Sequence, residues 1–293
     1  PLQLEQLCGK LEYTQTSASA GRCGRAALVV LREWATRKRG EGRRRQQPVS
    51  RDVEFALAFF AAVLPLLRPR KLKVRGKMVR DTVIVYSDAM YDAGKDIPAR
   101  IGFVIYDPEN PHPDDPEYVH TPWTFADKAL SPAEMALFAQ RKQQVGQLEV
   151  LGGVAPYSSC PAQLRGRDVI HFIDNTGALF GLAKGYYGEV DGARLVHAFH
   201  ATTAAIDANV WFEYVASEAN TADLPSRGDF DMLLEMGAKR VECVIPEIGG
   251  DWGRVYSDIM RRLAPHPSHG VKRQAAEIRA AIGEERAKCA RLA

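Results

Sequence analysis

The sequence lacks the features that mark membrane-spanning and disulfide-rich proteins. No apolar run reaches the roughly 18 to 20 residues that a membrane span needs, and the start of the chain has no signal-peptide layout. The cysteines are few and scattered, with no CxxC pair for zinc; they are Cys8, Cys23, Cys160, Cys243 and Cys289. We therefore expect a soluble, intracellular protein with reduced thiols and no membrane partner, in a compartment that the sequence does not indicate.

Charge is unevenly distributed, although the overall composition is ordinary for a soluble protein. Residues 1–80 contain 18 Lys+Arg and 6 Asp+Glu, a net charge of +12, whereas residues 81–293 contain 21 and 30, a net charge of −9. A basic segment attracts polyanions, and an acidic one can hold a cation. The basic run RKRGEGRRR (37–45) is explained equally well as a solvated loop.

Helical patterns dominate the basic part of the chain. Residues 2–39 predict two helices around the turn SASAGRCGR, and a third helix follows Ser50, which is placed to cap it. Pro65 should end or distort that third helix. The apolar faces of the second and third helices comprise Leu28, Leu31, Trp34, Ala35, Phe55, Phe59, Phe60 and Val63. We predict a small helical module over 1–80, in which the basic stretch 68–80 is a linker.

The pattern changes to strands after residue 81. Runs rich in β-branched residues predict strands at 82–91 and 99–107, and a weaker one at 118–125, because this last run contains Pro122. Ser131 and Glu134 form a capping-box pattern, from which we expect one long helix that includes Glu149.

Alternating strands and helices follow. Strands are predicted at 168–174 and 210–216, with helices after each and another at about 191–208. We expect an α/β domain over 81–232, with a mixed five-stranded sheet of three antiparallel and then two parallel strands flanked by helices. A C-terminal extension, 233–293, should end in a helix at 270–293.

Four carboxylates occupy notable places on this map. Asp88 lies in the first strand, Glu149 lies along the long helix, Asp174 ends the fourth strand, and Asp223 opens the helix after the fifth. The carboxyl ends of parallel strands meet in one crevice, where clustered carboxylates need a cation to neutralise them. Mg²⁺ prefers oxygen ligands, and a pair of such ions serves displacement at phosphodiesters. The alternative is that they are ordinary surface acids or helix caps among the 36 acidic residues.

The surrounding motifs resemble the ribonuclease H domain of retroelement reverse transcriptases. YSDA (86–89), QLEV (147–150), HFIDNTGA (171–178) and NTADLPSR (220–227) occur in the order of that family, and DN-x-x-A followed by N-x-AD-x-x-SR is the most specific pair. The preceding helices are similar to the thumb and connection region of DIRS-like retrotransposon polymerases. The fingers and palm are missing, so we expect no polymerase activity.

The resemblance implies a ribonuclease H-like fold and Mg²⁺-dependent hydrolysis of the RNA strand of RNA–DNA hybrids. It implies that Asp88, Glu149, Asp174 and Asp223 are catalytic and hold two Mg²⁺ ions, for which Mn²⁺ can substitute. The residues that we predict to bind nucleic acid are Asn175, Asn220, Ser226, Arg227, Lys10, Arg22 and Arg25. Structural alternatives remain, since Asn175 can cap the next helix, Asn220 can shape a turn, and Ser226 and Arg227 can serve as a cap and a local counter-charge.

One departure from the family favours a second hypothesis. Many of these nucleases carry a histidine shortly before the last aspartate, whereas this chain has Glu213 and Tyr214 there. His197 and His200 lack a third ligand, so we expect them in the core or at the surface and not on zinc. The alternative function is therefore a catalytically idle, retroelement-derived binding or structural subunit, whose extension docks a protein partner. A DNA-cleaving integrase or resolvase on the same fold is a third, less favoured reading.

Overall fold

The computed structural model describes residues 2–17, 22–40, 49–64, 82–109, 121–141, 144–248 and 251–263. Three predictions lie outside these residues: the role of Pro65, the linker at 68–80 and the terminal helix at 270–293.

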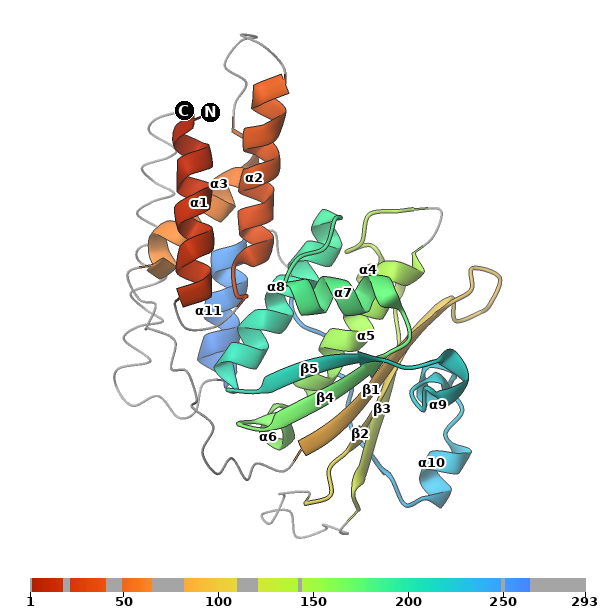
Figure 1. Ribbon diagram of the computed structural model, residues 1–293. Coiled ribbons are helices and arrows are strands. Elements are labelled where there is room, and N and C mark those ends of the chain that lie inside the picture. The colour runs from red at the N-terminus through yellow and green to blue at the C-terminus, as the bar shows by residue number, and fades with distance from the viewer. Residues whose placement is uncertain are drawn as a thin grey trace.

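A mixed sheet forms the centre of the fold (Figure 1). Its six strands lie in the order β5-β4-β1-β2-β3-β6. They are β1 (Thr82–Tyr91), β2 (Ala99–Tyr106), β3 (Trp123–Ala129), β4 (Asp168–Ile173), β5 (Asn209–Tyr214) and β6 (Lys239–Arg240). Strands β1 to β3 are antiparallel, and β4 and β5 add in parallel beside β1. This confirms the predicted fold class, an α/β fold whose mixed sheet has three antiparallel and then two parallel strands flanked by helices, with the two-residue β6 as an addition alongside β3.

The strands form where the sequence is rich in β-branched residues. In β1, Val83 and Val85 are fully buried, and Ile84 and Tyr86, which alternate with them, are half-buried. Both faces of this central strand are therefore covered, to different degrees. Strand β3 begins at Trp123, later than predicted, because Pro122 has no amide hydrogen to donate to a ladder.

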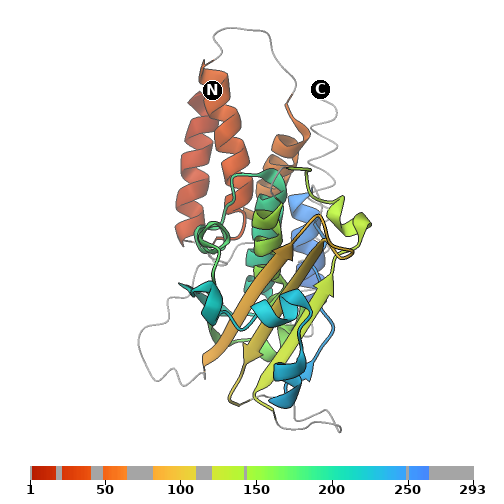
Figure 2. The same ribbon diagram turned by 90° about the vertical axis from the view of Figure 1, so that its right-hand side faces the viewer.

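Helices cover the sheet mainly on one side. They are α1 (Leu2–Ser17), α2 (Arg25–Gly40), α3 (Arg51–Val63), α4 (Pro132–Met135), α5 (Val145–Ser159), α6 (Pro161–Leu164), α7 (Thr176–Lys184), α8 (Val190–Ala205), α9 (Asp223–Arg227), α10 (Asp231–Glu235) and α11 (Trp252–Leu263). Helix α5 packs on β1 and β2, and α7 and α8 pack on α5. Helices α9 and α10 lie beside the strands away from α5 and α8 (Figure 2).

The three N-terminal helices join the main hydrophobic core. Leu28, Leu31 and Phe59 are buried in the same cluster as the residues between the sheet and α5. Helix α2 contacts α8, and α3 contacts α11. The ring of Phe59 packs edge-on against His197 of α8 and Tyr256 of α11, with centroids 5.2 Å and 5.9 Å apart. The domain boundaries that we inferred from composition stay predictions.

The predicted long helix is wrong, because it breaks between Met135 and Val145. Its start is correct: Ser131 and Glu134 form the capping box. Beyond α4, the Ala139 amide and the Arg141 side chain both donate to Asp191 at the start of α8, at 3.0 and 2.7 Å. These distant partners replace the helical bonds of the segment. Ser50 occupies the N-cap position of α3 as predicted, but its side chain makes no cap hydrogen bond.

Gly152 allows α5 to approach β1 closely. A Cβ atom at this position would lie 2.9 Å from the backbone oxygen of Asp88. Real Cβ atoms do not come so near to backbone, so a side chain here would push the helix and the strand apart. The absence of a side chain at Gly152 thus sets the distance between α5 and β1, and the contact is at Asp88, a predicted catalytic residue.

Replacing Gly152 by alanine should therefore lower the free energy of unfolding by about 1–3 kcal/mol, the usual cost of overpacking. Gly9→Ala is the matched helical control, because a Cβ atom there meets nothing within 4 Å. That substitution should raise the free energy of unfolding by roughly 0.5–1 kcal/mol, since alanine favours helix. Urea denaturation of both variants measures the difference, and stabilisation by Gly152→Ala would contradict the close approach.

Candidate metal centre

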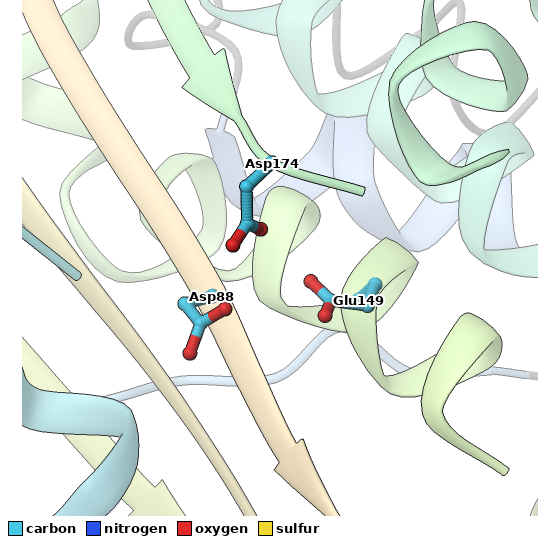
Figure 3. Close-up of side chains that lie close together, drawn as sticks. All are labelled: Asp88, Glu149 and Asp174. Atoms are coloured by element: carbon cyan, nitrogen blue, oxygen red, sulfur yellow. The ribbon is translucent and has the colours of Figure 1, made fainter. Parts of the chain in front are cut away.

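Three acidic side chains from separate elements meet at one point (Figure 3). Asp88 comes from β1, Glu149 from α5, and Asp174 directly follows β4. Each offers a carboxylate oxygen, and these oxygens all lie within 4.8 Å of one another. Figure 3 shows the carboxylates of Asp174 and Glu149 directed toward the space beside Asp88. We call Asp88, Glu149 and Asp174 the acidic cluster.

Strand register explains why Asp88 and Asp174 are neighbours. Ser87 of β1 pairs with Ile173 of β4, the last pair of this parallel ladder. The next residue on each strand is an aspartate, so the two lie side by side just past the end of the ladder. Glu149 reaches the same place because Gly152, one turn further along α5, lets the helix rest on Asp88.

The acidic cluster is largely removed from water. Asp88 and Glu149 are each only 6% exposed. Burial, together with the charges of Asp88 and Asp174, raises the pKa of Glu149 to about 9. Burial also raises the pKa of Asp88 to about 6, against a hydrogen bond from Ser226 that lowers it. Holding all three carboxylates ionised without a cation is therefore costly.

Two oxygens of the cluster are left without hydrogen bonds. Within the described part of the chain, Glu149 Oε2 and Asp174 Oδ1 are buried and have no partner. A buried, unpartnered carboxylate oxygen is costly unless an ion binds it. The cluster also offers oxygen ligands alone, the type that hard divalent cations take. The residues present therefore fit a divalent metal ion.

Asp223, the fourth predicted ligand, lies outside the acidic cluster. Its Oδ1 accepts a hydrogen bond from Arg227 Nε at 2.6 Å, within α9. It is still near, because its charge contributes to the raised pKa of Asp88. A metal-binding role for Asp223 stays a prediction.

Two predicted nucleic-acid contacts are instead buried beneath the cluster. Ser226 is 0% exposed, and its hydroxyl donates to Asp88 Oδ2. Asn220 is 4% exposed; its amide nitrogen donates to the Ser87 carbonyl at 3.1 Å, and its oxygen accepts from the Ala222 amide. These bonds tie α9 and the segment before it to β1. The bond from the Ala222 amide is the turn role that the structural alternative gave Asn220, whereas Ser226 lies within α9 and bonds Asp88 instead of capping a helix. Contact of either residue with nucleic acid stays a prediction.

A second glycine, Gly102 of β2, makes room for α9. Gly102 pairs with Asp88 across the ladder, and a Cβ atom on it would overlap the backbone of Ser226, lying 2.9 Å from its Cα. Sequence reasoning missed the roles of both Gly102 and Gly152. The available signal was a glycine inside an apolar run, IGFVIY for Gly102, which is typical of a close backbone approach.

The remaining predicted contacts lie at the rim of the cluster or away from it. The Asn175 side chain accepts from the Ala178 amide at 3.0 Å and so caps α7. Arg227 is largely exposed and paired with Asp223. Lys10 and Arg22 are exposed and Arg25 is half-buried, all on the N-terminal helices and the turn between them. For all of these residues, binding to nucleic acid stays a prediction.

The histidines that the structure describes are buried or half-buried. Buried His197 bonds the Trp252 carbonyl, and half-buried His200 bonds the Leu182 carbonyl. At the end of β5, Glu213 and Tyr214 are exposed, next to the segment that leads to α9. His171, which the sequence analysis did not single out, is buried between Tyr157 and Ser87 and bonds both, at 3.1 and 2.9 Å.

Comparisons with known proteins add little. No family model matches the chain, and no curated protein matches it. Among solved structures, the chain is similar to the N-terminal RNase H domain of a Mycobacterium tuberculosis protein, solved as a fusion with maltose-binding protein. The identity is 14% and the TM-score 0.37, over 54% of this chain and 99% of that one. Similarity this low carries no information on function, which has to come from the site.

The described residues include no helix that is long and apolar enough to cross a membrane.

The acidic cluster predicts an unusual pH dependence of stability. The folded pKa of Glu149, about 9, lies above its ordinary value of 4.5, so its contribution to stability is full below pH 4.5 and is lost as the pH rises toward 9. In EDTA, the free energy of unfolding should fall by roughly 1 kcal/mol per pH unit between pH 6 and pH 9. Glu149→Gln should flatten this slope, whereas Glu235→Gln on the exposed side of α10 should not. Urea denaturation across this pH range measures it, and equal slopes in all three proteins would refute the assignment.

Ser226 should matter for cation binding through Asp88. Without its hydroxyl, Asp88 loses the donor that fixes one oxygen, and loss of such an outer partner typically costs at least about 10-fold in metal affinity. We expect calorimetric titration with Mn²⁺ to show this loss in Ser226→Ala. Ser217→Ala is the control, because Ser217 is exposed on the same segment. Equal Mn²⁺ affinity in Ser226→Ala and the unsubstituted protein would show that the bond does not support the site.

Proposed function

We propose that this protein is a Mg²⁺-dependent endonuclease that hydrolyses the RNA strand of RNA–DNA hybrids. The observation that carries the proposal is the convergence of Asp88, Glu149 and Asp174, with two buried oxygens left unpartnered. The resemblance of the surrounding motifs to retroelement ribonuclease H domains supports the choice of substrate. A retroelement origin is part of the same proposal.

In the proposed reaction, Asp88, Glu149 and Asp174, together with Asp223, would hold two Mg²⁺ ions. The chemistry that such a metal pair would supply at a phosphodiester is activation of the attacking water and stabilisation of the leaving oxygen. Ser226 orients Asp88 by its hydrogen bond. Because Glu149 and Asp88 have raised pKa values, both must lose protons for metal to bind, so metal affinity should rise with pH.

The basic N-terminal module would hold the hybrid. Its net charge of +12 over residues 1–80 can neutralise phosphates without reading sequence. Lys10, Arg22 and Arg25 are the described residues that we propose for this role. Choice of the RNA strand would follow from contacts to 2′-hydroxyl groups, which DNA lacks.

A second candidate function is an idle subunit that binds nucleic acid without cleaving it. Two observations favour it: Glu213 and Tyr214 occupy the place of the usual histidine, and Asp223 is bonded to Arg227 outside the acidic cluster. In this case the extension would bind a protein partner. Its described helix α11 already packs against α3 and α8 of its own chain, which leaves less of it for that role.

Cleavage of a labelled RNA–DNA hybrid in Mg²⁺ decides between the two functions. The unsubstituted protein should cut only the RNA strand and leave 3′-hydroxyl and 5′-phosphate ends. Asp174→Asn should reduce the rate by at least about 100-fold, because it removes a charged ligand from the cluster. Asp96→Asn, on the exposed β1–β2 turn, is the matched control and should cut normally.

Other outcomes have distinct meanings. If the unsubstituted protein and Asp174→Asn bind the hybrid and are equally inert, the idle subunit is the correct reading. Cleavage of duplex DNA in preference to the hybrid would instead indicate an integrase or resolvase activity.

A further inference from the structure

Tyr187, in the segment between α7 and α8, lies in a slot lined by glycines. A Cβ atom on Gly181 of α7 would lie 2.6 Å from Cδ2 of the ring, and one on Gly192 of α8 would lie 2.9 Å from Cγ. Any side chain at either position would collide with the ring. The ring also packs against the main hydrophobic cluster. The two helices therefore fix the direction in which Tyr187 points.

The hydroxyl of Tyr187 lies next to the acidic cluster. A Cβ atom on Gly146 would be 2.9 Å from this oxygen, and one on Gly177 would be 4.0 Å from it. Gly146 precedes Glu149 by one turn on α5, and Gly177 lies in the first turn of α7, just after Asp174. The hydroxyl thus sits between the two segments that carry Glu149 and Asp174, and the charge of Glu149 acts on it.

This hydroxyl makes no hydrogen bond within the described part of the chain, although Tyr187 is half-buried. Three of the nearby charged groups bond one another: Arg141 donates to both oxygens of Asp191, at 2.7 and 2.9 Å, and to Glu189 at 3.2 Å. Burial and the surrounding acids raise the pKa of Tyr187, so its hydroxyl keeps its proton and can donate. If Tyr187 served only to fill space between α7 and α8, the aromatic ring would be enough and the hydroxyl would have no role.

We propose that Tyr187 is a substrate-positioning residue whose hydroxyl donates a hydrogen bond to a backbone phosphate of the nucleic acid strand that lies over the acidic cluster. The proposal rests on the proposed function, because it takes the cluster as the place where the strand binds. A phosphate is the acceptor that this position favours, since the hydroxyl lies at the edge of a site whose proposed chemistry is at a phosphate. The glycine slot holds the donor in place before the strand arrives, which lowers the entropic cost of the contact.

Removing only the hydroxyl tests this role. In an Asp174→Asn background with Mg²⁺, fluorescence anisotropy gives the affinity for a labelled RNA–DNA hybrid without cleavage. Tyr187→Phe should weaken binding about 3- to 10-fold, the range expected for one hydrogen bond. Tyr186→Phe, the neighbouring tyrosine outside the slot, should bind normally. The melting temperature of Tyr187→Phe should stay unchanged, because the hydroxyl has no described partner to lose.

The outcome of this test is independent of whether the protein cleaves the hybrid. If the unsubstituted protein is inert, the nuclease proposal fails while the binding comparison still stands. If it is active, Tyr187→Phe should raise KM by the same factor and leave kcat within about twofold, as expected for an interaction made equally in the ground state and the transition state. Equal hybrid affinity with and without the hydroxyl would overturn the role of Tyr187.

A second variant tests the slot itself. Gly192→Ala would displace the ring, so it should weaken binding about as much as Tyr187→Phe, and the double variant should lose no more than either single one. Additive losses would mean that the glycine acts elsewhere and would remove the slot from the proposal. Neutral methylphosphonates placed one at a time along each strand then locate the phosphate, since Tyr187→Phe should cost less where the contacted phosphate is already neutral.

Discussion

Mutual repulsion among three carboxylates, held away from water, is the constraint around which this molecule is organised. Repulsion favours moving these side chains apart, but the fold fixes their positions. Asp88 lies on a central strand, Glu149 on a buried helix, and Asp174 at the end of a strand. Such an arrangement lowers the stability of the ion-free protein. Proteins retain arrangements of this kind where function requires them, and a cation bound at this position would offset the cost.

The parts of this site that could be predicted from sequence depend on short-range pattern. Asp174 follows a buried strand, and Asp88 lies near the end of the parallel neighbouring strand. Recognising the two strands and their parallel pairing is therefore enough to predict that these aspartates lie close together. The break between α4 and α5 could not be predicted in the same way. It depends on Arg141 and Ala139 bonding Asp191, about 50 residues away, and nothing local in the sequence signals that pairing.

The motif residues show a different limit of sequence reasoning. Asn220 and Ser226 have side chains that suit a phosphate or sugar as well as they suit a neighbouring backbone group, so residue type alone left both interpretations open. The structure adds that each side chain is enclosed and bonded to β1, an arrangement that residue type alone did not indicate, while contact with nucleic acid stays a prediction. For Asp223 the sequence placed the residue correctly at the start of a helix, but the direction of its carboxylate depends on Arg227, one turn later.

The glycines at 102 and 152 have an implication for how such a site can vary. Both place main chain against main chain at Asp88, from β2 toward α9 and from α5 toward β1. The spacing of these elements around the acidic cluster is thus set by the polypeptide backbone and not by side chains. An aspartate and a glutamate could then exchange within the cluster, moving an oxygen by the length of one methylene group, while the surrounding framework kept its shape. Selectivity among ions of different radius could in this way be altered without rebuilding the protein.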